Sequence, residues 1–413
     1  MSIKVFLPNL QEAQTINEII TPEFINLNPM VPFSRLSIDF LNSISRNILA
    51  YRNINDFPEL VALAYWLRRA NITQMVSSFT STVSAGEFLL PCGIAFHIAP
   101  SNVDSIFLYS WALSLIAGNK NIVRVTQYLS EQISLLLEII RTTVSDNEFA
   151  DIASRNIIIT YPREDEINRQ ISGNADLRLI WGGDETIRSI RRIDAKPACR
   201  DIAFADKFSY SVINARTYNN SDEQTLKQLA ENFYNDSYWF DQKACSSPII
   251  LYFSGTPEQC RKASQTFWNN LTDILYTKKR ADSAGLAMDK LVFSFENMLE
   301  SEKIELLSNQ NFKKPSVMRI TKSEIPAKRN TCGGGFFYEC FIESLSELEQ
   351  FIADNDQTLT YSGFSQDELE NFIHRACAKG IVRIVPIGQA LLFNPVWDGF
   401  VLLSELTKRL TLK

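Results

Sequence analysis

The sequence predicts an α/β protein in which helices cover parallel sheets. Short apolar, β-branched segments predict buried strands at residues 122–125, 156–160, 177–181, 210–214 and 249–253. Helical periodicities lie between them at residues 130–144, 185–193 and 222–235. Alternation of strand and helix is typical of parallel sheets, because two parallel strands are joined by a crossover that is usually a helix. The 413 residues are enough for two or three domains with filled cores.

The first ninety residues are predicted to be mainly helical. An apolar strand then ends in Pro100-Ser101-Asn102 and leads into a helix that closes near Gly118. Open α/β sheets bind ligands where a strand end leads into a helix, and the Asn102 amide there can donate a hydrogen bond to an oxyanion. Alternatively, Asn102 caps the helix, since asparagine is a preferred N-cap; the residues alone favour this interpretation.

The strand at residues 177–181 ends in Gly182 and Gly183, directly before a helix that starts with Asp184. Glycines let a backbone approach a pyrophosphate closely, and a helix N-terminus favours anions. The pattern is not Gly-x-Gly-x-x-Gly, and Asp184 and Glu185 add negative charge. An ordinary strand-to-helix turn is therefore the alternative.

Cys245 lies on a polar connection, residues 239–248, that enters the predicted strand at residues 249–253. Most free cysteines are small buried hydrophobes, but a thiol on a polar connection is better placed to be an exposed, activatable thiolate. Cys245 is thus the candidate nucleophile for covalent acyl or aldehyde chemistry. Packing is the expected role of the others: Cys92, Cys199, Cys260, Cys332, Cys340 and Cys377.

Two further features are expected along the chain. His374 is predicted on a surface helix, and His97 is expected to be packed in a core or to lie next to a cofactor. A Ser-Leu-Ser-Glu start predicts another helix at residues 344–353.

Composition excludes several classes of function. A net charge of −6 provides no basic surface for nucleic acid. The longest apolar run, residues 106–118, is too short to span a membrane, and the N-terminus lacks the blocks of a signal peptide. Seven cysteines without a Cys-x-x-Cys pair indicate a reducing compartment and no zinc site, and two histidines exclude a multi-histidine metal centre. We therefore expect a cytoplasmic protein without a metal.

In their order and spacing, these segments resemble the aldehyde dehydrogenase superfamily, and within it the acyl-CoA reductase (LuxC) family. The superfamily's Pro-x-Gly strand and its Pro-Trp-Asn end are matched, with Ser101 replacing Trp, by Pro91, Gly93, Pro100 and Asn102. The Asp-Gln-x-x-Cys-Ser-Ser-Pro motif at Cys245 looks like the LuxC branch, as do residues 383–388 and 397–399. The resemblance runs from about residue 85 to the end.

The resemblance implies an aldehyde-dehydrogenase-like fold with three parts. A helical region and a Rossmann-type dinucleotide-binding domain are expected at residues 1–208, and an α/β catalytic domain carrying Cys245 at residues 209–385. A small C-terminal oligomerisation segment, residues 386–413, is expected to return to the cofactor domain or to an oligomer interface. A homo-oligomer is therefore implied.

The resemblance also implies a nicotinamide cofactor. Arg124 and Gln127 stand where the superfamily binds the adenosine ribose, and a neutral Gln127 in place of glutamate tolerates a 2′-phosphate. We therefore expect NADPH, although an arginine at a strand end is most often a solvated surface residue. The remaining implied cofactor-binding residues are Pro100, Ser101, Gly182, Gly183 and Asp184.

One departure from the superfamily points to reduction. Oxidising relatives have a glutamate that activates water to hydrolyse the thioester, whereas Ala203 stands at the corresponding position here. The implied reaction is NADPH-dependent reduction of a long-chain fatty acyl group to the aldehyde through an S-acyl intermediate on Cys245. The oxyanion would be held by the Asn102 amide and the Cys245 backbone N–H. The acyl donor is CoA, or a protein charged by an acyl-protein synthetase.

Two alternatives remain open at this point. One is a CoA-acylating aldehyde dehydrogenase for short acyl groups, which uses the same residues. The other is a catalytically silent subunit of an acyl-transfer complex. The sequence leaves open the acyl chain length, the donor and the general acid–base residue.

Overall fold

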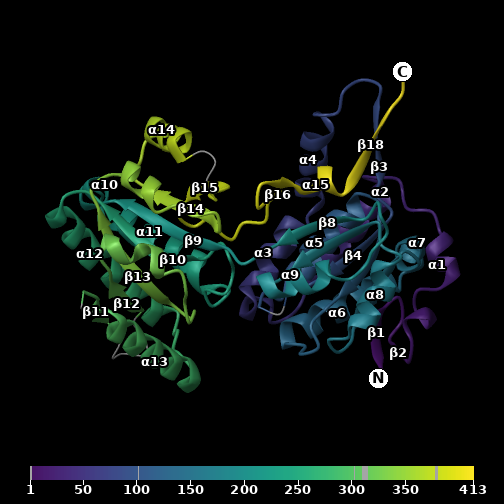
Figure 1. Ribbon diagram of the computed structural model, residues 1–413, viewed down its shortest axis with the longest axis horizontal. Helices are drawn as coiled ribbons and strands as arrows, with labels where there is room; N and C mark the ends of the chain where they lie inside the picture. The colour runs from purple at the N-terminus through teal and green to yellow at the C-terminus, as the bar shows by residue number, and fades with distance from the viewer. Residues whose placement is uncertain (1, 101, 302, 309–314, 377–379) are drawn as a thin grey trace. The chain divides into compact units, whose positions relative to one another are not determined.

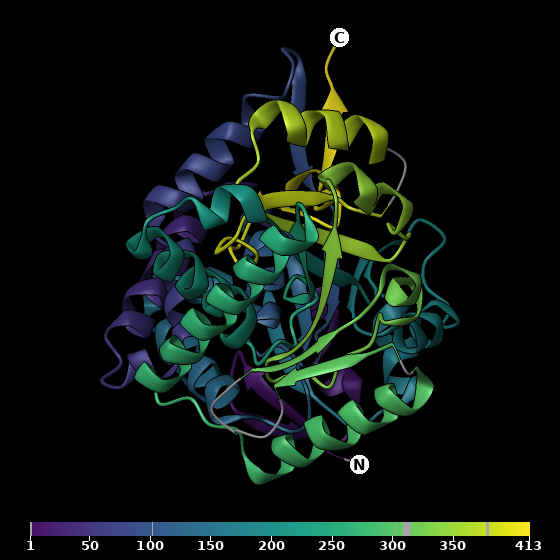
Figure 2. The same cartoon turned by 90° about the vertical axis from the view of Figure 1, so that its left-hand side faces the viewer.

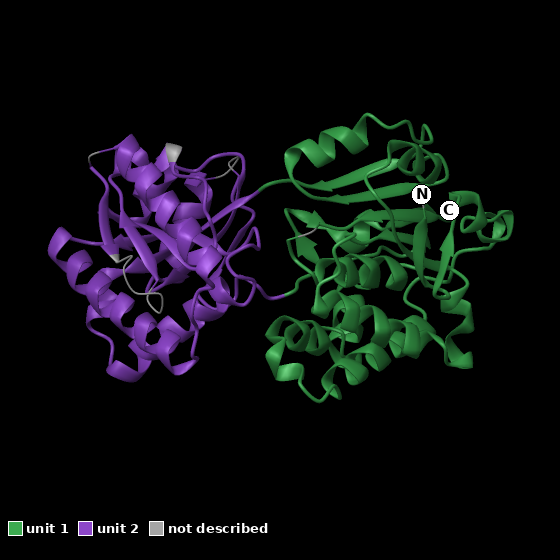
Figure 3. Ribbon diagram, turned by 90° about the horizontal axis from the view of Figure 1, so that it is seen from below, with its two compact units in different colours: residues 1–206, 393–413 green, residues 207–392 purple. Residues whose placement is uncertain are grey.

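The computed structural model of the protein describes residues 2–100, 102–301, 303–308, 315–376 and 380–413. The chain divides into two compact units (Figure 3). The first consists of Met1–Asp206 together with Phe393–Lys413, and the second of Lys207–Leu392. The C-terminal stretch thus belongs to the first unit, and the second unit extends beyond the expected boundary at residue 385.

A seven-stranded sheet forms the centre of the first unit, in the order β2-β1-β6-β5-β4-β7-β8. Its strands are β1 (Ile3–Leu7), β2 (Gln11–Ala13), β4 (Ile94–Ile98), β5 (Lys120–Arg124), β6 (Asn156–Thr160), β7 (Leu177–Trp181) and β8 (Arg200–Phe204). Neighbours from β6 to β8 are parallel, while β1 is antiparallel to both β6 and β2. The N-terminal region, expected to be mainly helical, therefore opens with two antiparallel strands at one side of the sheet, of which β2 is the edge strand.

Helices cover both faces of this sheet (Figure 1). They are α1 (Pro22–Asn26), α2 (Arg35–Leu49), α3 (Pro58–Trp66), α4 (Arg69–Thr80), α5 (Ile106–Ile116), α6 (Glu131–Val144), α7 (Ala150–Ala153), α8 (Asp165–Ser172), α9 (Asp184–Arg191) and α15 (Leu402–Glu405). A hydrophobic core lies on each face of the sheet, and successive strand residues point alternately into one and the other. Val123 packs with α2, α5 and α6, whereas Ile122 packs with α8 and α9. This alternation is the period of two expected of a strand buried on both faces. Across the described helices, none is long and apolar enough to cross a membrane.

The C-terminal stretch of the first unit contains a hairpin and an arm. The hairpin pairs β16 (Val396–Trp397) with β17 (Phe400–Val401), and positive φ angles of 49° at Asp398 and 80° at Gly399 indicate a type I′ turn. In the arm, β18 (Thr407–Thr411) pairs antiparallel with β3 (Glu87–Pro91).

The second unit has its own seven-stranded sheet, in the order β11-β12-β13-β10-β9-β14-β15. The strands are β9 (Phe208–Asn214), β10 (Pro248–Ser254), β11 (Glu305–Ser308), β12 (Ser316–Arg319), β13 (Phe336–Ile342), β14 (Asp356–Ser362) and β15 (Arg383–Pro386). All neighbours are parallel except β11 and β12. The parallel sheets predicted from the alternating pattern are thus confirmed in both units.

Helices also lie on both faces of the second sheet (Figure 2). They are α10 (Ala215–Asn219), α11 (Glu223–Tyr238), α12 (Pro257–Thr277), α13 (Ala284–Glu300) and α14 (Gln366–Ala376). The helix predicted at residues 344–353 is instead a short 3₁₀ helix, Leu345–Gln350. The Ser344 hydroxyl forms a hydrogen bond with Ser346 rather than with the backbone, so the expected cap is missing.

Candidate active site

Cys245 lies on the connection between α11 and β10, at the amino end of a central, fully buried strand of the second unit. It is half-buried. The Ser209 hydroxyl, at the start of the neighbouring strand β9, donates a 2.7 Å hydrogen bond to the Cys245 carbonyl. The nucleophile expected from the sequence therefore stands on a polar connection fixed to the sheet edge.

The Cys245 sulfur contacts a buried amide. Gln357 Nε2 at the start of β14 donates to Cys245 Sγ over 3.3 Å, and the Gln357 side chain is buried. A hydrogen bond donated to sulfur favours the thiolate over the thiol. The sequence analysis missed Gln357 because it lies 112 residues from Cys245 and no local motif marks it.

Gln242 holds the Cys245 connection against a glycine turn. Its buried amide donates to the carbonyls of Pro248 at 2.9 Å and Phe336 at 2.8 Å. Its oxygen accepts from the backbone N–H groups of Gly335 and Phe336, both at 3.0 Å. Gly335 has a φ of 88°, and an added Cβ would lie 2.2 Å from the Tyr238 hydroxyl, so glycine is required there.

The segment that resembled the LuxC branch at residues 383–388 is tied to α11, the helix that leads to Cys245. Asp236 of α11 accepts hydrogen bonds from the N–H groups of Gly388 at 2.6 Å and Ala390 at 2.9 Å. Burial raises the pKa of the Asp236 carboxyl to about 7. The loop after β15 is thus anchored to the same helix as the Cys245 connection.

The other described cysteines are less suited to nucleophilic chemistry. Cys92, Cys260 and Cys340 are buried, which confirms their expected packing role. Burial raises the thiol pKa of Cys92 and Cys199, and it raises that of Cys260 and Cys332 to about 11 and that of Cys340 to about 12. Cys377 lies outside the described residues.

The two histidines have different surroundings. His97 of the first unit is fully buried, with Nδ1 at 2.8 Å from the Ser110 hydroxyl and Nε2 at 3.1 Å from Asn121 Oδ1. Burial lowers its pKa to about 4, so the ring is neutral. His374 is exposed near the end of α14, as predicted.

In the first unit, the candidate cofactor residues gather at the carboxyl edge of the sheet. Pro100 and Asn102 follow β4, Arg124 ends β5 and Gly182 follows β7, and these three strands are adjacent. The carboxyl edge is where open α/β sheets bind ligands. Gln127 is exposed just after β5, and Ser101 lies outside the described residues.

Asn102 does not cap the helix, so the interpretation that the residues alone favoured is wrong. Helix α5 begins at Ile106, and Ser105 occupies the cap position. The Ser105 N–H donates instead to the buried carboxylate of Glu59 in α3, at 2.8 Å. A distant carboxylate therefore satisfies this helix start, which leaves the exposed Asn102 side chain outside the helix.

The N-terminus of α9 is acidic. The Asp206 carboxylate accepts a 3.3 Å hydrogen bond from the Asp184 N–H, and an added Cβ at Gly183 would lie 3.0 Å from Asp206 Oδ2. Asp184 and Glu185 pair with Arg188 at 3.4 and 3.6 Å. A pyrophosphate at this turn would have to displace the exposed Asp206 side chain.

Two arginines lie close together beyond β5 and β6. The Arg124 guanidinium lies 4.6 Å from the centre of the Tyr161 ring, and its buried Nε has no partner among the described residues. Burial, followed by the positive charge of Arg163, lowers the pKa of Arg124, although the Tyr161 interaction opposes this. Within the described residues neither arginine forms an ion pair. Sequence reasoning missed Arg163, because only the pairing of β5 with β6 brings it near Arg124.

Solved structures share this fold. Aldehyde dehydrogenase 21 from Physcomitrella patens, solved with the product succinate, superposes with a TM-score of 0.63 at 12% identity over 95% of this chain and 88% of its own. A structure of PnpE with nicotinamide adenine dinucleotide gives a TM-score of 0.65 at 12% identity over 99% and 93% of the two chains. The chain therefore has the fold of the aldehyde dehydrogenases.

The sequence profile of the acyl-CoA reductase (LuxC) family matches residues 68–409, and the chain belongs to that family. The long-chain acyl-protein thioester reductase of Vibrio harveyi is 24% identical over 302 residues, which cover 68% of this chain and 59% of that protein. The chain spans about three-fifths of the length of the first curated relatives it matches.

Proposed function

We propose that the protein reduces a long-chain acyl thioester to the aldehyde, with NADPH as reductant and Cys245 as nucleophile. The observation that carries this proposal is the placement of Cys245, half-buried on a fixed connection with the Gln357 amide donating to its sulfur. Family membership and the name of the Vibrio harveyi relative, a long-chain acyl-protein thioester reductase, support the choice of substrate.

In the first step the Cys245 thiolate attacks the thioester carbonyl. A new carbon–sulfur bond forms, the donor thiolate leaves with its electron pair, and an S-acyl cysteine results. The Cys245 backbone N–H would stabilise the oxyanion, and the resemblance assigns a second donor, the Asn102 amide of the first unit. Each such donor contributes about 3 kcal/mol to transition-state stabilisation.

The first unit would bind the cofactor at its carboxyl edge. Arg124 and Arg163 suit a 2′-phosphate, since neither forms an ion pair within the described residues. Arg124 Nη2 donates to the Tyr161 carbonyl at 3.5 Å, but its buried Nε has no partner there. NADPH, when bound, would supply the hydride for the carbonyl carbon of the S-acyl group; the carbon–sulfur bond of the resulting thiohemiacetal anion then breaks to give the aldehyde and the Cys245 thiolate. The exposed Asp206 must leave the N-terminus of α9 for the pyrophosphate to bind there.

Ala203 supports reduction rather than hydrolysis. It stands where oxidising relatives have the glutamate that activates water. Ala203 lies on β8, half-buried, and offers no carboxylate to activate water. Without such a base at that position, the S-acyl group persists long enough to be reduced.

The proposal is tested by following NADPH consumption with acyl-CoA substrates from butanoyl to hexadecanoyl. We expect activity with the long chains and none for Cys245→Ala, with Cys260→Ala as the matched control that keeps activity. A preference for short chains would favour the CoA-acylating dehydrogenase. Absence of both NADPH consumption and acyl labelling in the wild type would favour a silent subunit.

A further inference from the structure

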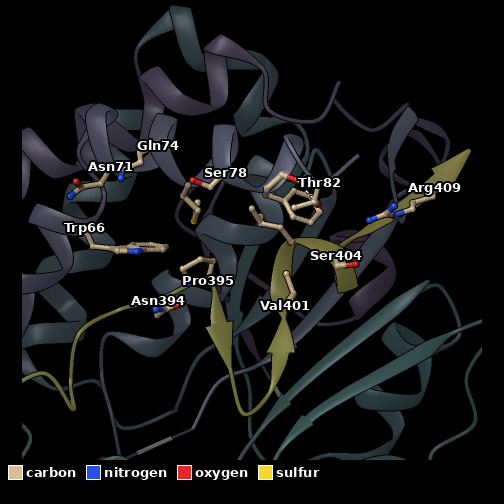
Figure 4. Close-up of a pocket in the computed structure, with 13 residues that line it drawn as sticks. Trp66, Asn71, Gln74, Ser78, Thr82, Asn394, Pro395, Val401, Ser404 and Arg409 are labelled. Atoms are coloured by element: carbon tan, nitrogen blue, oxygen red, sulfur yellow. Dashed lines mark hydrogen bonds between the residues drawn. The ribbon is translucent and has the colours of Figure 1, made fainter. Parts of the chain in front are cut away.

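The first unit contains a cavity of about 590 Å³ whose lining includes none of the candidate cofactor residues (Figure 4). One wall is a single face of α4, which carries Met75, Ser78 and Phe79. The opposite wall is the C-terminal stretch, from Asn394 to Arg409. The volume of the cavity falls within the range of small-molecule sites, about 300–1,000 Å³.

The lining of this cavity suits an uncharged, flexible ligand. Both walls carry apolar and uncharged polar side chains. The apolar ones are Trp66, Met75, Phe79, Pro395, Val401 and Leu403, and the uncharged polar ones are Asn71, Gln74, Ser78, Thr82, Asn394 and Ser404. Arg409, the charged member of the lining, lies at the end opposite Trp66 in Figure 4 and pairs with Glu87 at 2.9 Å. Since that charge is already compensated, the cavity offers little to an anionic head group and much to an alkyl chain.

Aromatic rings connect the cavity to the carboxyl edge of the sheet. Trp66 contacts Tyr109 of α5 with 5.2 Å between ring centres, and Tyr109 contacts Trp181 at the end of β7 at 6.1 Å. The Tyr109 hydroxyl also donates to the carbonyl of Asn394, a lining residue. The Trp66 end of the cavity is thus linked through packed rings to Trp181, the last residue of β7, which Gly182 follows.

We propose that this cavity binds the distal part of the alkyl chain of the long-chain acyl substrate, with the carbonyl end leaving past Trp66. Met75 and Phe79, one helical turn apart, would contact successive methylenes, and the unbranched Met75 can adapt to the chain. Asn71 and Phe79 are about 12 Å apart along the helix axis, which suits a long chain and far exceeds the need of a short one. The assignment rests on the proposed function.

The test fills the cavity from an exposed helix position and measures chain binding directly. Ser78 lines the cavity, whereas the adjacent Ser77 is also exposed and does not line it, so Ser78→Phe and Ser77→Phe form a matched pair. We expect Ser78→Phe to weaken binding of the fluorescent fatty acid cis-parinaric acid at least about tenfold, since each displaced methylene changes affinity about fourfold. Ser77→Phe should bind it as the wild type does.

Kinetics distinguish the substrate chain from a free fatty acid. Ser78→Phe should lower kcat/KM for tetradecanoyl-CoA at least about tenfold and leave that for butanoyl-CoA unchanged. Loss of parinaric acid binding without loss of tetradecanoyl-CoA activity would overturn the assignment to the substrate, and unchanged binding would overturn the alkyl site itself. Met75→Ala, which enlarges the cavity, should shift the preference toward longer chains. If the wild type reduces no acyl-CoA, the proposed function fails, yet the titration still decides whether the cavity binds an alkyl chain.

Discussion

Replacing Gln242 with leucine tests whether the Cys245 connection is held by the glycine turn. The substitution keeps the apolar stem but removes a donor of two hydrogen bonds and an acceptor of two, all to backbone groups. An unsatisfied buried backbone group costs about 1–3 kcal/mol, and neighbouring costs are not additive. We therefore expect the free energy of unfolding to fall by about 3–5 kcal/mol, which is at the upper end for one substitution.

The measurement is a urea titration followed by tryptophan fluorescence, together with the rate of Cys245 alkylation by iodoacetamide. Gln228→Leu is the matched control, because Gln228 is exposed on α11 and donates a hydrogen bond to the half-buried side chain of Asn232 rather than to a backbone group. It should change the free energy of unfolding by less than about 0.5 kcal/mol. If Gln242→Leu had the same unfolding midpoint and the same rate of alkylation as the wild type, the Gln242 hydrogen bonds would not be what holds the Cys245 connection.

Three further substitutions test the first unit. The pKa of His97 is about 4 in the folded protein, whereas that of an isolated histidine side chain is 6.5. The unfolded chain therefore takes up the proton first as the pH falls. The free energy of unfolding, measured by urea titration, should therefore drop by about 3 kcal/mol between pH 6.5 and 4. In His97→Gln this loss on acidification should be absent. Arg163→Gln should weaken NADPH binding at least about fivefold in fluorescence titrations and leave NADH binding unchanged, with the exposed Arg192→Gln as control. Equal losses for both nucleotides would contradict a 2′-phosphate site. Asp206→Ala should tighten the binding of both nucleotides about twofold to fivefold, because it frees the Asp184 N–H at a helix N-terminus; no change would show that Asp206 does not compete with the cofactor.

Local sequence signals located much of the fold. The apolar runs predicted at residues 156–160 and 177–181 coincide with β6 and β7, since strands buried on both faces have an uninterrupted apolar signal. Ser130 and Asp222 cap α6 and α11, next to the helical periods predicted there. The polar composition of the connection around Cys245 was equally visible, because it depends on adjacent residues alone, although the structure buries Gln242, Ser246 and Ser247.

The features that sequence reasoning missed depend on contacts between distant residues. Gln357 meets Cys245 because β14 and β10 both lie beside β9, and Gln242 finds its partners on β13. The start of α5 is satisfied by Glu59 from another helix, which no pattern around Asn102 reveals. Strand β1 is too short to be distinguished by its period, and its pairing with β2 and β6 defines it.

The most direct measurement is intact and peptide mass spectrometry after mixing the protein with tetradecanoyl-CoA in the absence of NADPH. We expect one tetradecanoyl group on the peptide that contains Cys245, none on Cys245→Ala, and loss of the adduct with release of tetradecanal once NADPH is added. An adduct on another residue, or full reductase activity in Cys245→Ala, would contradict the central role given to Cys245.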